Sequence, residues 1–161
     1  MAVGPRIVFV RFLTSDSPKL APWVAHARRV VESKPDTVAT KPSEGEGVIV
    51  WQLVSANNRQ LARGVDVHES FEGAHADASI AVGARSQLSI DLVSEAGRGV
   101  YGWFASLDDR PVVTCARWYF TDRDRRHSIE LALKSISVAT LHTGARLTDP
   151  ALMAGDRGSI N

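Results

Sequence analysis

Hydrophobic positions recur with two different periods along the chain, and the changes of period mark the elements. Residues 6–13 form an apolar run rich in β-branched and aromatic side chains, which predicts a strand. The next segment predicts a helix over 21–33, with Pro22 in its first turn. Its apolar residues share one helical face: Leu20, Trp23, Val24, Ala27, Val30 and Val31. Residues 34–47 contain two Pro and two Gly without any apolar period, so we interpret them as a linker.

Beyond the linker, the pattern predicts short strands in hairpins, with a helix after each hairpin. A turn is expected at Asn57 and Asn58, because asparagine tolerates the left-handed backbone conformation. Ser70 and Thr121 are expected to cap the two helices through their hydroxyl groups. The predicted elements are strands over 48–54, 59–67, 86–94, 100–107, 112–120 and 136–146, and helices over 71–83 and 122–135.

The second hairpin and helix repeat the order of the first. A shift of 51 residues places Ser70 on Thr121, whereas Trp51 and Trp103 coincide only at a shift of 52. Few residues are identical, so the matching order of elements is what predicts two copies of one unit. The predicted organisation is an N-terminal strand-helix extension over 1–33, the linker over 34–47, two units over 48–97 and 98–147, and a flexible tail over 148–161.

The string WQLVSANNRQLARG, a strand that leads through an Asn-rich turn into a second strand and then a helix, resembles the repeat of the YegP family of small bacterial proteins. The resemblance covers residues 48–145 and is better in the first unit than in the second. It implies an α+β fold, in which two tandem β-β-(β)-α-β units share a single antiparallel sheet with helices packed on one face. It also implies that the last strand of each unit is exchanged into the other half. The family has no established activity, so no catalytic residue can be carried over.

Composition excludes several classes of protein. The 161 residues include 19 Lys and Arg against 18 Asp and Glu, and this balance lacks the strong positive field of a dedicated nucleic-acid binder. The sequence contains no apolar run of the length that a transmembrane helix needs, and we identify no signal peptide, so we expect a cytoplasmic protein without a membrane partner. The basic residues are mostly Arg, a bias that favours a bacterial, actinobacterial-like source.

The chemistry-bearing residues predict no enzyme. Cys115 is the only cysteine, which excludes an internal disulfide, and its place in the middle of a strand predicts a buried, inert thiol. The five His residues show no metal-ligand spacing. We recognise no nucleophile, phosphate-loop or paired-carboxylate motif. We therefore predict neither a metal nor a cofactor.

Two features are candidates for binding a partner. Basic residues gather at the start of helix 122–135, where free backbone N–H groups would favour a phosphate or an acidic partner. The competing interpretation is a solvated helix start, because Asp122 and Asp124 alternate with the Arg residues. Aromatic residues of the strands form the second feature, which would be a core layer, a face covered by the N-terminal segment or a second subunit, or a base-stacking surface. The candidate partner-binding residues are Arg110, Arg117, Trp118, Tyr119, Arg123, Arg125 and Arg126.

These observations lead to one functional hypothesis and two alternatives. The hypothesis is a non-enzymatic protein-interaction module whose partner is another protein or a further copy of this chain. The first alternative is a nucleic-acid-binding module that uses the Arg cluster and the sheet aromatics. The second is a small-ligand binder, which an enclosed pocket with converging polar groups would reveal.

Overall fold

The residues that the structure describes form one seven-stranded sheet with helices on both of its faces. The computed structural model describes residues 4–34 and 48–147. In chain order the elements of these ranges are β1 (Arg6–Arg11), α1 (Ala21–Glu32), β2 (Ile49–Val54), β3 (Gln60–Gly64), α2 (Phe71–Gly83), the short 3-10 helix η1 (Arg85–Gln87), β4 (Ser89–Glu95), β5 (Val100–Leu107), β6 (Arg110–Cys115), α3 (Asp122–Ile136) and β7 (Thr140–Leu147). The predicted tail 148–161, and the predicted linker except for Lys34, lie outside the described residues.

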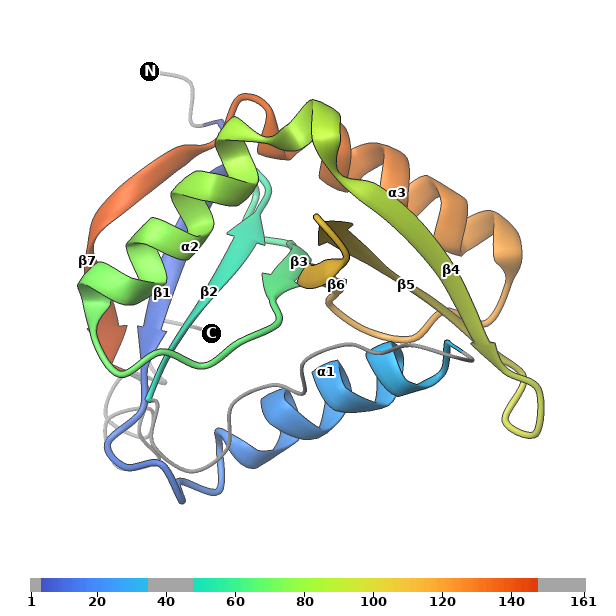
Figure 1. Ribbon diagram of the computed structural model, residues 1–161, viewed down its shortest axis with the longest axis horizontal. Coiled ribbons are helices and arrows are strands. Elements are labelled where there is room, and N and C mark those ends of the chain that lie inside the picture. Colours follow the sequence, from blue (N-terminus) through green and yellow to red (C-terminus); the bar gives the residue numbers. More distant parts are fainter. Residues whose placement is uncertain (1–3, 35–47, 148–161) are drawn as a thin grey trace.

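The strand order across the sheet is β4-β5-β6-β3-β2-β1-β7 (Figure 1). Neighbouring strands run antiparallel, except that β1 and β7 are parallel. The predicted α+β fold with a single sheet is confirmed, but the sheet is mixed rather than wholly antiparallel. β1 lies between β2 and β7, so the N-terminal strand is an interior strand of the sheet.

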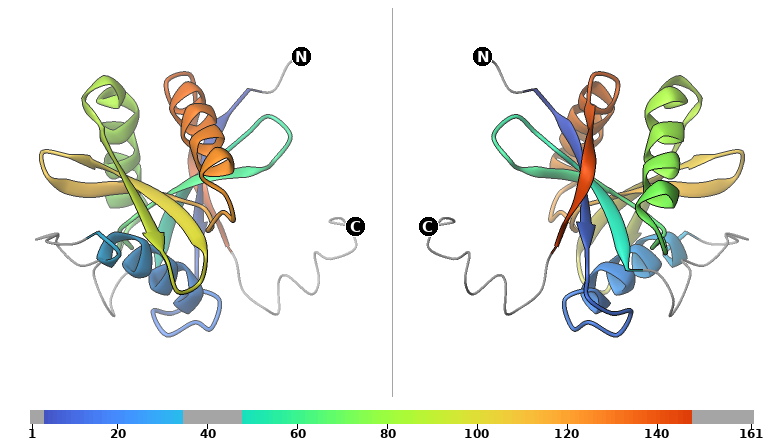
Figure 2. Two further views of the ribbon diagram at one scale, coloured as in Figure 1. Left: turned by 90° about the vertical axis from the view of Figure 1, so that its right-hand side faces the viewer. Right: turned by 90° about the vertical axis from the view of Figure 1, so that its left-hand side faces the viewer.

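Helices α2 and α3 cover one face of the sheet (Figure 2). On this face, the ring of Phe9 in β1 packs edge-on against Phe71 of α2, with the ring centroids 4.9 Å apart. The indole of Trp103 in β5 is buried beneath α3 and donates a hydrogen bond to Ser128. These large buried rings anchor both helices to the same side of the sheet.

Helix α1 covers part of the opposite face (Figures 1 and 2). Its buried residues are Ala27, Val30 and Val31, three members of the apolar stripe that predicts this helix. The imidazole of His26 lies over this face and donates from Nε2 to the carbonyl oxygen of Cys115, 2.8 Å away. Burial lowers the pKa of His26, which suits a neutral ring between helix and sheet. Of the interpretations open for the aromatic strands, a face covered by the N-terminal segment agrees with this position of α1.

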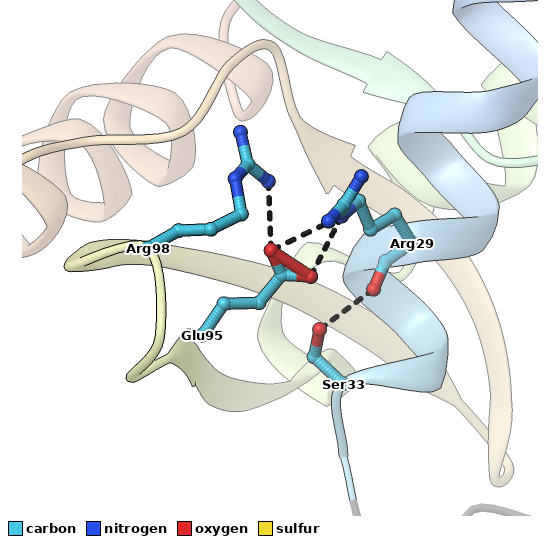
Figure 3. A network of polar contacts seen from close by, with 4 residues as sticks. All are labelled: Arg29, Ser33, Glu95 and Arg98. Carbon is cyan, nitrogen blue, oxygen red and sulfur yellow. Dashed lines mark hydrogen bonds and ion pairs between the residues drawn. The ribbon is translucent and has the colours of Figure 1, made fainter.

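An ion-pair network fastens the C-terminal end of α1 to the turn between β4 and β5 (Figure 3). The carboxylate of Glu95 lies between two guanidinium groups and accepts hydrogen bonds from Arg29 and Arg98, each with a closest distance of 2.7 Å. Ser33 donates its hydroxyl to the carbonyl oxygen of Arg29 and extends the network to the end of the helix. A hydrogen bond from Arg29, and a second one from Arg98, lower the pKa of Glu95. The carboxylate therefore stays charged at pH values at which a glutamate side chain ordinarily becomes protonated.

The helix caps and one turn follow the sequence predictions. Ser70 accepts a hydrogen bond from the backbone N–H of Gly73, and Thr121 accepts one from the N–H of Asp124, each at 3.0 Å. Asn58 has a φ of 68°, which is the left-handed conformation expected of this turn. Predicted helices over 71–83 and 122–135 are confirmed to within one residue.

Two hairpin strands are shorter than the sequence predicts. The predicted strand over 112–120 corresponds to β6, which ends at Cys115, and only an isolated bridge between Tyr101 and Tyr119 continues the pairing. The first hairpin ends in a similar way, with an isolated bridge between Ile49 and His68 after β3. In both hairpins the chain therefore leaves the ladder and pairs once more just before the helix cap.

Candidate functional site

A surface pocket of about 230 Å³ lies where β3, β6 and α3 meet. The antiparallel pairing of β3 with β6 brings the start of β3 next to the end of β6, and α3 begins a few residues later. The pocket is lined by side chains from all three segments: Arg59, Gln60, Leu61, Arg117, Tyr119, Asp124, His127, Ser128 and Leu131. Polar groups of several kinds therefore converge on one hollow, the feature that distinguishes a pocket from a flat sheet.

Two guanidinium groups line this pocket from the strand side. The guanidinium of Arg117 lies over the ring of Tyr119, 5.3 Å from the ring centroid, and this stacking restrains its orientation. Ser55 holds the backbone of Arg59 through hydrogen bonds at its N–H and its carbonyl oxygen. The Arg59 guanidinium, in contrast, has no hydrogen bond or ion pair with any residue that the structure describes. The Arg117 guanidinium is thus restrained by Tyr119, Arg59 is held at its backbone, and neither makes an ion pair with a carboxylate of the described residues.

The helix side of the pocket carries an anion and two smaller polar groups. Asp124 supplies a carboxylate from the first turn of α3, and the exposed imidazole of His127 lies one turn further along. Ser128 is buried, and its Oγ accepts the indole N–H of Trp103 at 3.0 Å. Its hydroxyl hydrogen is thus left to donate elsewhere, because no acceptor for it is found in residues 4–34 and 48–147.

An exposed aromatic residue directly follows one of the pocket residues in the sequence. Phe120 follows Tyr119 directly, and 79% of its surface is exposed. Arg123, in the first turn of α3, is also exposed and makes no hydrogen bond or ion pair with a described residue through its side chain. We call the region made by the pocket residues Arg59, Arg117, Tyr119 and His127, together with the segment Phe120–Arg123 that directly follows Tyr119 in the chain, the β6–α3 face.

The structure separates the other predicted residues from this face. Arg110 opens β6, so it lies at the opposite end of that strand from Arg117, and it pairs with Asp66. Arg126 is exposed but pairs with Asp122 at 2.8 Å, one helical turn earlier. Hydrogen bonds from Arg126 and Arg125 lower the pKa of Asp122, which keeps this carboxylate charged.

Arg125 is a buried structural residue rather than part of an exposed cluster. Only 8% of its surface is exposed, and its guanidinium donates to the carbonyl oxygen of Val93 in β4 at 3.0 Å. It also pairs with Asp122 and lies over the ring of Tyr101, 5.1 Å from the centroid. Because these groups already engage its guanidinium, Arg125 ties α3 to the edge strand and is not available to a partner.

Trp118 points to the other side of the sheet from Tyr119. Its ring lies 6.0 Å from the imidazole of His26 in α1, centroid to centroid, and it covers Gly102 closely. The predicted set of Arg117, Trp118 and Tyr119 is therefore divided between two faces. Trp51 and Trp103 are buried in the core, so β2 and β5 offer no open indole surface for stacking bases.

Sequence reasoning misses three residues of this region. Arg59 belongs to the first hairpin, and only the pairing of β3 with β6 brings it to the pocket. Asp124 lines the pocket, whereas the sequence pattern assigns it only the neutralisation of the Arg cluster. Phe120 falls at the end of a predicted strand, but the strand ends five residues earlier. The sequence does carry a signal, because an apolar residue directly before a helix cap normally packs on an apolar residue four positions into the helix, and that position is Arg125 here.

Neither a metal centre nor a membrane-spanning helix is found in the described part of the chain. No group of three His, Cys, Asp or Glu side chains in residues 4–34 and 48–147 is arranged to hold a metal ion. Within the same ranges, no helix has the length and apolar character needed to cross a membrane.

Comparison with known proteins identifies one solved structure with a similar arrangement. No protein-family model and no curated protein matches the sequence. The chain is similar to the solution NMR structure of YegP from E. coli, a protein of unknown function. The identity is 10%, the alignment covers 90% of this chain and 93% of that one, and the TM-score is 0.45. This neighbour carries no activity or partner to transfer.

Proposed function

We propose that this chain is a non-enzymatic interaction module that binds a segment of a partner protein on its β6–α3 face. The observation that carries the proposal is the exposure of Phe120, 79% of whose surface is in contact with solvent, one residue after Tyr119, which lines a pocket together with two Arg residues that make no ion pair with a described carboxylate. Aromatic and Arg side chains are the residues that most often dominate the energy of a protein interface. A partner segment that places an apolar side chain on Phe120 and an acidic one near Arg117 would fit this face.

The charges around the pocket favour a protein over a nucleic acid. Asp124 lines the pocket, and Asp122 lies in the same helical turn, so carboxylates interrupt the positive surface. A nucleic-acid groove follows a phosphate backbone with continuous positive charge, and carboxylates along it weaken binding. Discrete acidic side chains of a peptide need only local cations. The observation that supports nucleic acid as the second candidate is the Arg117 guanidinium stacked on Tyr119, a combination that also holds bases.

The test is a selection of random peptides displayed on phage against the full chain, with counter-selection against the Phe120→Ala variant. Because Phe120 is largely exposed, the variant should fold and keep the same amide spectrum. We expect enriched peptides that combine acidic with apolar residues and bind the variant at least about tenfold more weakly, the loss typical of an aromatic anchor. Peptides that bind both proteins equally would contradict the proposal.

Single-stranded DNA and RNA oligonucleotides provide the competing arm of this test. Binding that falls steeply between about 50 and 200 mM salt and requires Arg117 would favour the nucleic-acid candidate instead. Light scattering of the purified chain distinguishes a second copy from a foreign partner. If the chain is a dimer and Phe120→Ala converts it to a monomer, the β6–α3 face binds a second copy of this chain.

We also propose that the two halves of the sheet are copies of one unit, in a protein of the cytoplasm. The support is geometric, since the Trp51 and Trp103 hydrogen bonds and the two isolated bridges recur at offsets of 51 and 52 residues. The cytoplasmic location is a separate proposal, supported by the single buried free thiol of Cys115, which is compatible with a reducing compartment.

A further inference from the structure

We infer that the pocket between β3, β6 and α3 is a subsite for a carboxylate, and that the carboxylate is the side chain of an acidic residue of the bound partner. This inference rests on the proposed function and adds the chemistry that selects the partner. Arg59 and Arg117 line the pocket from the strand side, and neither has a carboxylate partner among the described residues. Guanidinium groups bind carboxylates through paired, charge-assisted hydrogen bonds.

The size of the pocket favours a single side chain over a whole small molecule. Its volume is about 230 Å³, whereas pockets for cofactors and drug-sized ligands hold roughly 300–1,000 Å³. Leu61 and Leu131 supply apolar lining that can contact the methylene groups of an Asp or Glu side chain. The hydroxyl of Ser128, left with a hydrogen to donate, is a third group that can meet a carboxylate oxygen.

Asp124 makes the subsite selective among anions. Its carboxylate lines the same pocket as the two guanidinium groups, so it repels a bound dianion more strongly than a bound monoanion. A phosphorylated side chain carries close to two negative charges at neutral pH, whereas an Asp or Glu side chain carries one. The arrangement therefore favours a carboxylate over a phosphate.

The subsite is tested by NMR titration of the full chain with N-acetyl-aspartate amide, its neutral asparagine analogue, N-acetyl-phosphoserine amide and succinate. We expect the aspartate compound to shift the side-chain Nε–H signals of Arg59 and Arg117 saturably, and the asparagine analogue to leave them unchanged. Arg59→Gln and Arg117→Gln should each weaken binding about tenfold, the effect of losing a charge-assisted hydrogen bond. Arg11→Gln, an exposed Arg on β1, is the matched control and should bind normally.

The phosphoserine and succinate arms decide the source and charge of the ligand. Asp124→Asn should strengthen binding of the phosphoserine compound more than that of the aspartate compound. Tighter binding of phosphoserine than of aspartate to the unmodified chain would overturn the selectivity for carboxylate. If succinate binds much more tightly than the aspartate compound, the ligand is a free dicarboxylate, and the assignment of the carboxylate to a partner side chain is wrong.

Failure of this inference can be separated from failure of the proposed function. If peptides need Phe120 but bind Arg59→Gln and Arg117→Gln normally, the face is an interface and the subsite is wrong. If the aspartate compound binds at Arg117 but no peptide is selected, the carboxylate subsite stands, but the proposed function and the assignment of the carboxylate to a partner side chain are wrong. Absence of saturable shifts at both Arg signals would overturn the inference directly.

Discussion

The indole N–H of Trp51 in β2 donates to the Oδ2 atom of Asp77 in α2, 2.8 Å away. The same oxygen lies 3.3 Å from Nε2 of His68, so one largely buried carboxylate joins a strand, a loop and a helix. In the other half of the sheet, Trp103 of β5 donates to Ser128 of α3 at 3.0 Å. Each helix is thus attached to a strand of its hairpin by one indole hydrogen bond, but only the first acceptor is a carboxylate.

This difference predicts unequal costs for removing the two acceptors. Asp77→Ala should lower the free energy of unfolding by about 1.5–3 kcal/mol, the range for hydrogen bonds to charged groups, and Ser128→Ala by about 0.5–1.5 kcal/mol. Urea unfolding followed by tryptophan fluorescence measures both. Asp77→Asn keeps an acceptor for the indole and is the control, with a smaller expected loss. A Ser128→Ala variant that is less stable than Asp77→Ala would show that the carboxylate is not the stronger anchor.

The close approach of Trp51 to β3 predicts a strict requirement for glycine at position 64. A Cβ atom on Gly64 would lie 2.4 Å from Nε1 of Trp51, and the burial of this ring and its hydrogen bond to Asp77 both oppose its moving aside. Gly64→Ala should therefore lower the free energy of unfolding by about 1–3 kcal/mol through overpacking. Gly83, at the end of α2, has open space around its Cα and is the matched position. Equal midpoints for Gly64→Ala and Gly83→Ala in urea would refute the steric account.

The periodicity of apolar residues is sufficient to predict the helices and strands, but it does not predict how they are arranged in space. The apolar stripe of α1 and the caps Ser70 and Thr121 act within a few residues, so a local pattern contains them. The parallel pairing of β1 with β7 joins the two ends of the described chain, and no local period encodes which strands become neighbours. Periodicity also reports which side of the chain is buried, not where the ladder of hydrogen bonds ends, which is why the pattern predicts β6 too long.

The candidate site is predictable only in part, for a similar reason. Arg117 and Tyr119 are two residues apart in one segment, so a strand pattern already places them on one face. Arg59 reaches the same pocket through tertiary pairing, which the sequence alone does not show. The burial of Arg125 has a sequence signal, because this residue lies one helical turn before Ile129, which the pattern predicts to face the core.

The contrast between two adjacent Arg residues gives a third prediction. Arg125→Ala removes a buried hydrogen bond to Val93 and the packing on Tyr101, and it should lower the free energy of unfolding by roughly 1.5–3 kcal/mol. Arg126→Ala removes an exposed ion pair with Asp122 and should leave the unfolding midpoint nearly unchanged. Thermal and urea unfolding of both variants give the comparison. Equal losses from the two variants would mean that Arg125 is not anchoring α3 to β4.

The thiol of Cys115 predicts a specific loss of stability at high pH. Burial raises the pKa of this group from its ordinary value of 9.0 to about 11. Between these values the thiol ionises in the unfolded chain but stays protonated in the folded one, so the unfolded state binds fewer protons and stability falls as pH rises. The stability contributed by the protonated thiol is complete below pH 9 and should be lost by about pH 11, a fall in the free energy of unfolding on the order of 2 kcal/mol.

The Cys115→Ala variant lacks this thiol but shares every other titrating group. The difference between the two proteins in urea unfolding from about pH 8 to 11 therefore isolates the contribution of the thiol. Parallel stability curves for the two proteins, or rapid labelling of the native thiol by N-ethylmaleimide at about pH 8, would show that Cys115 is accessible to solvent.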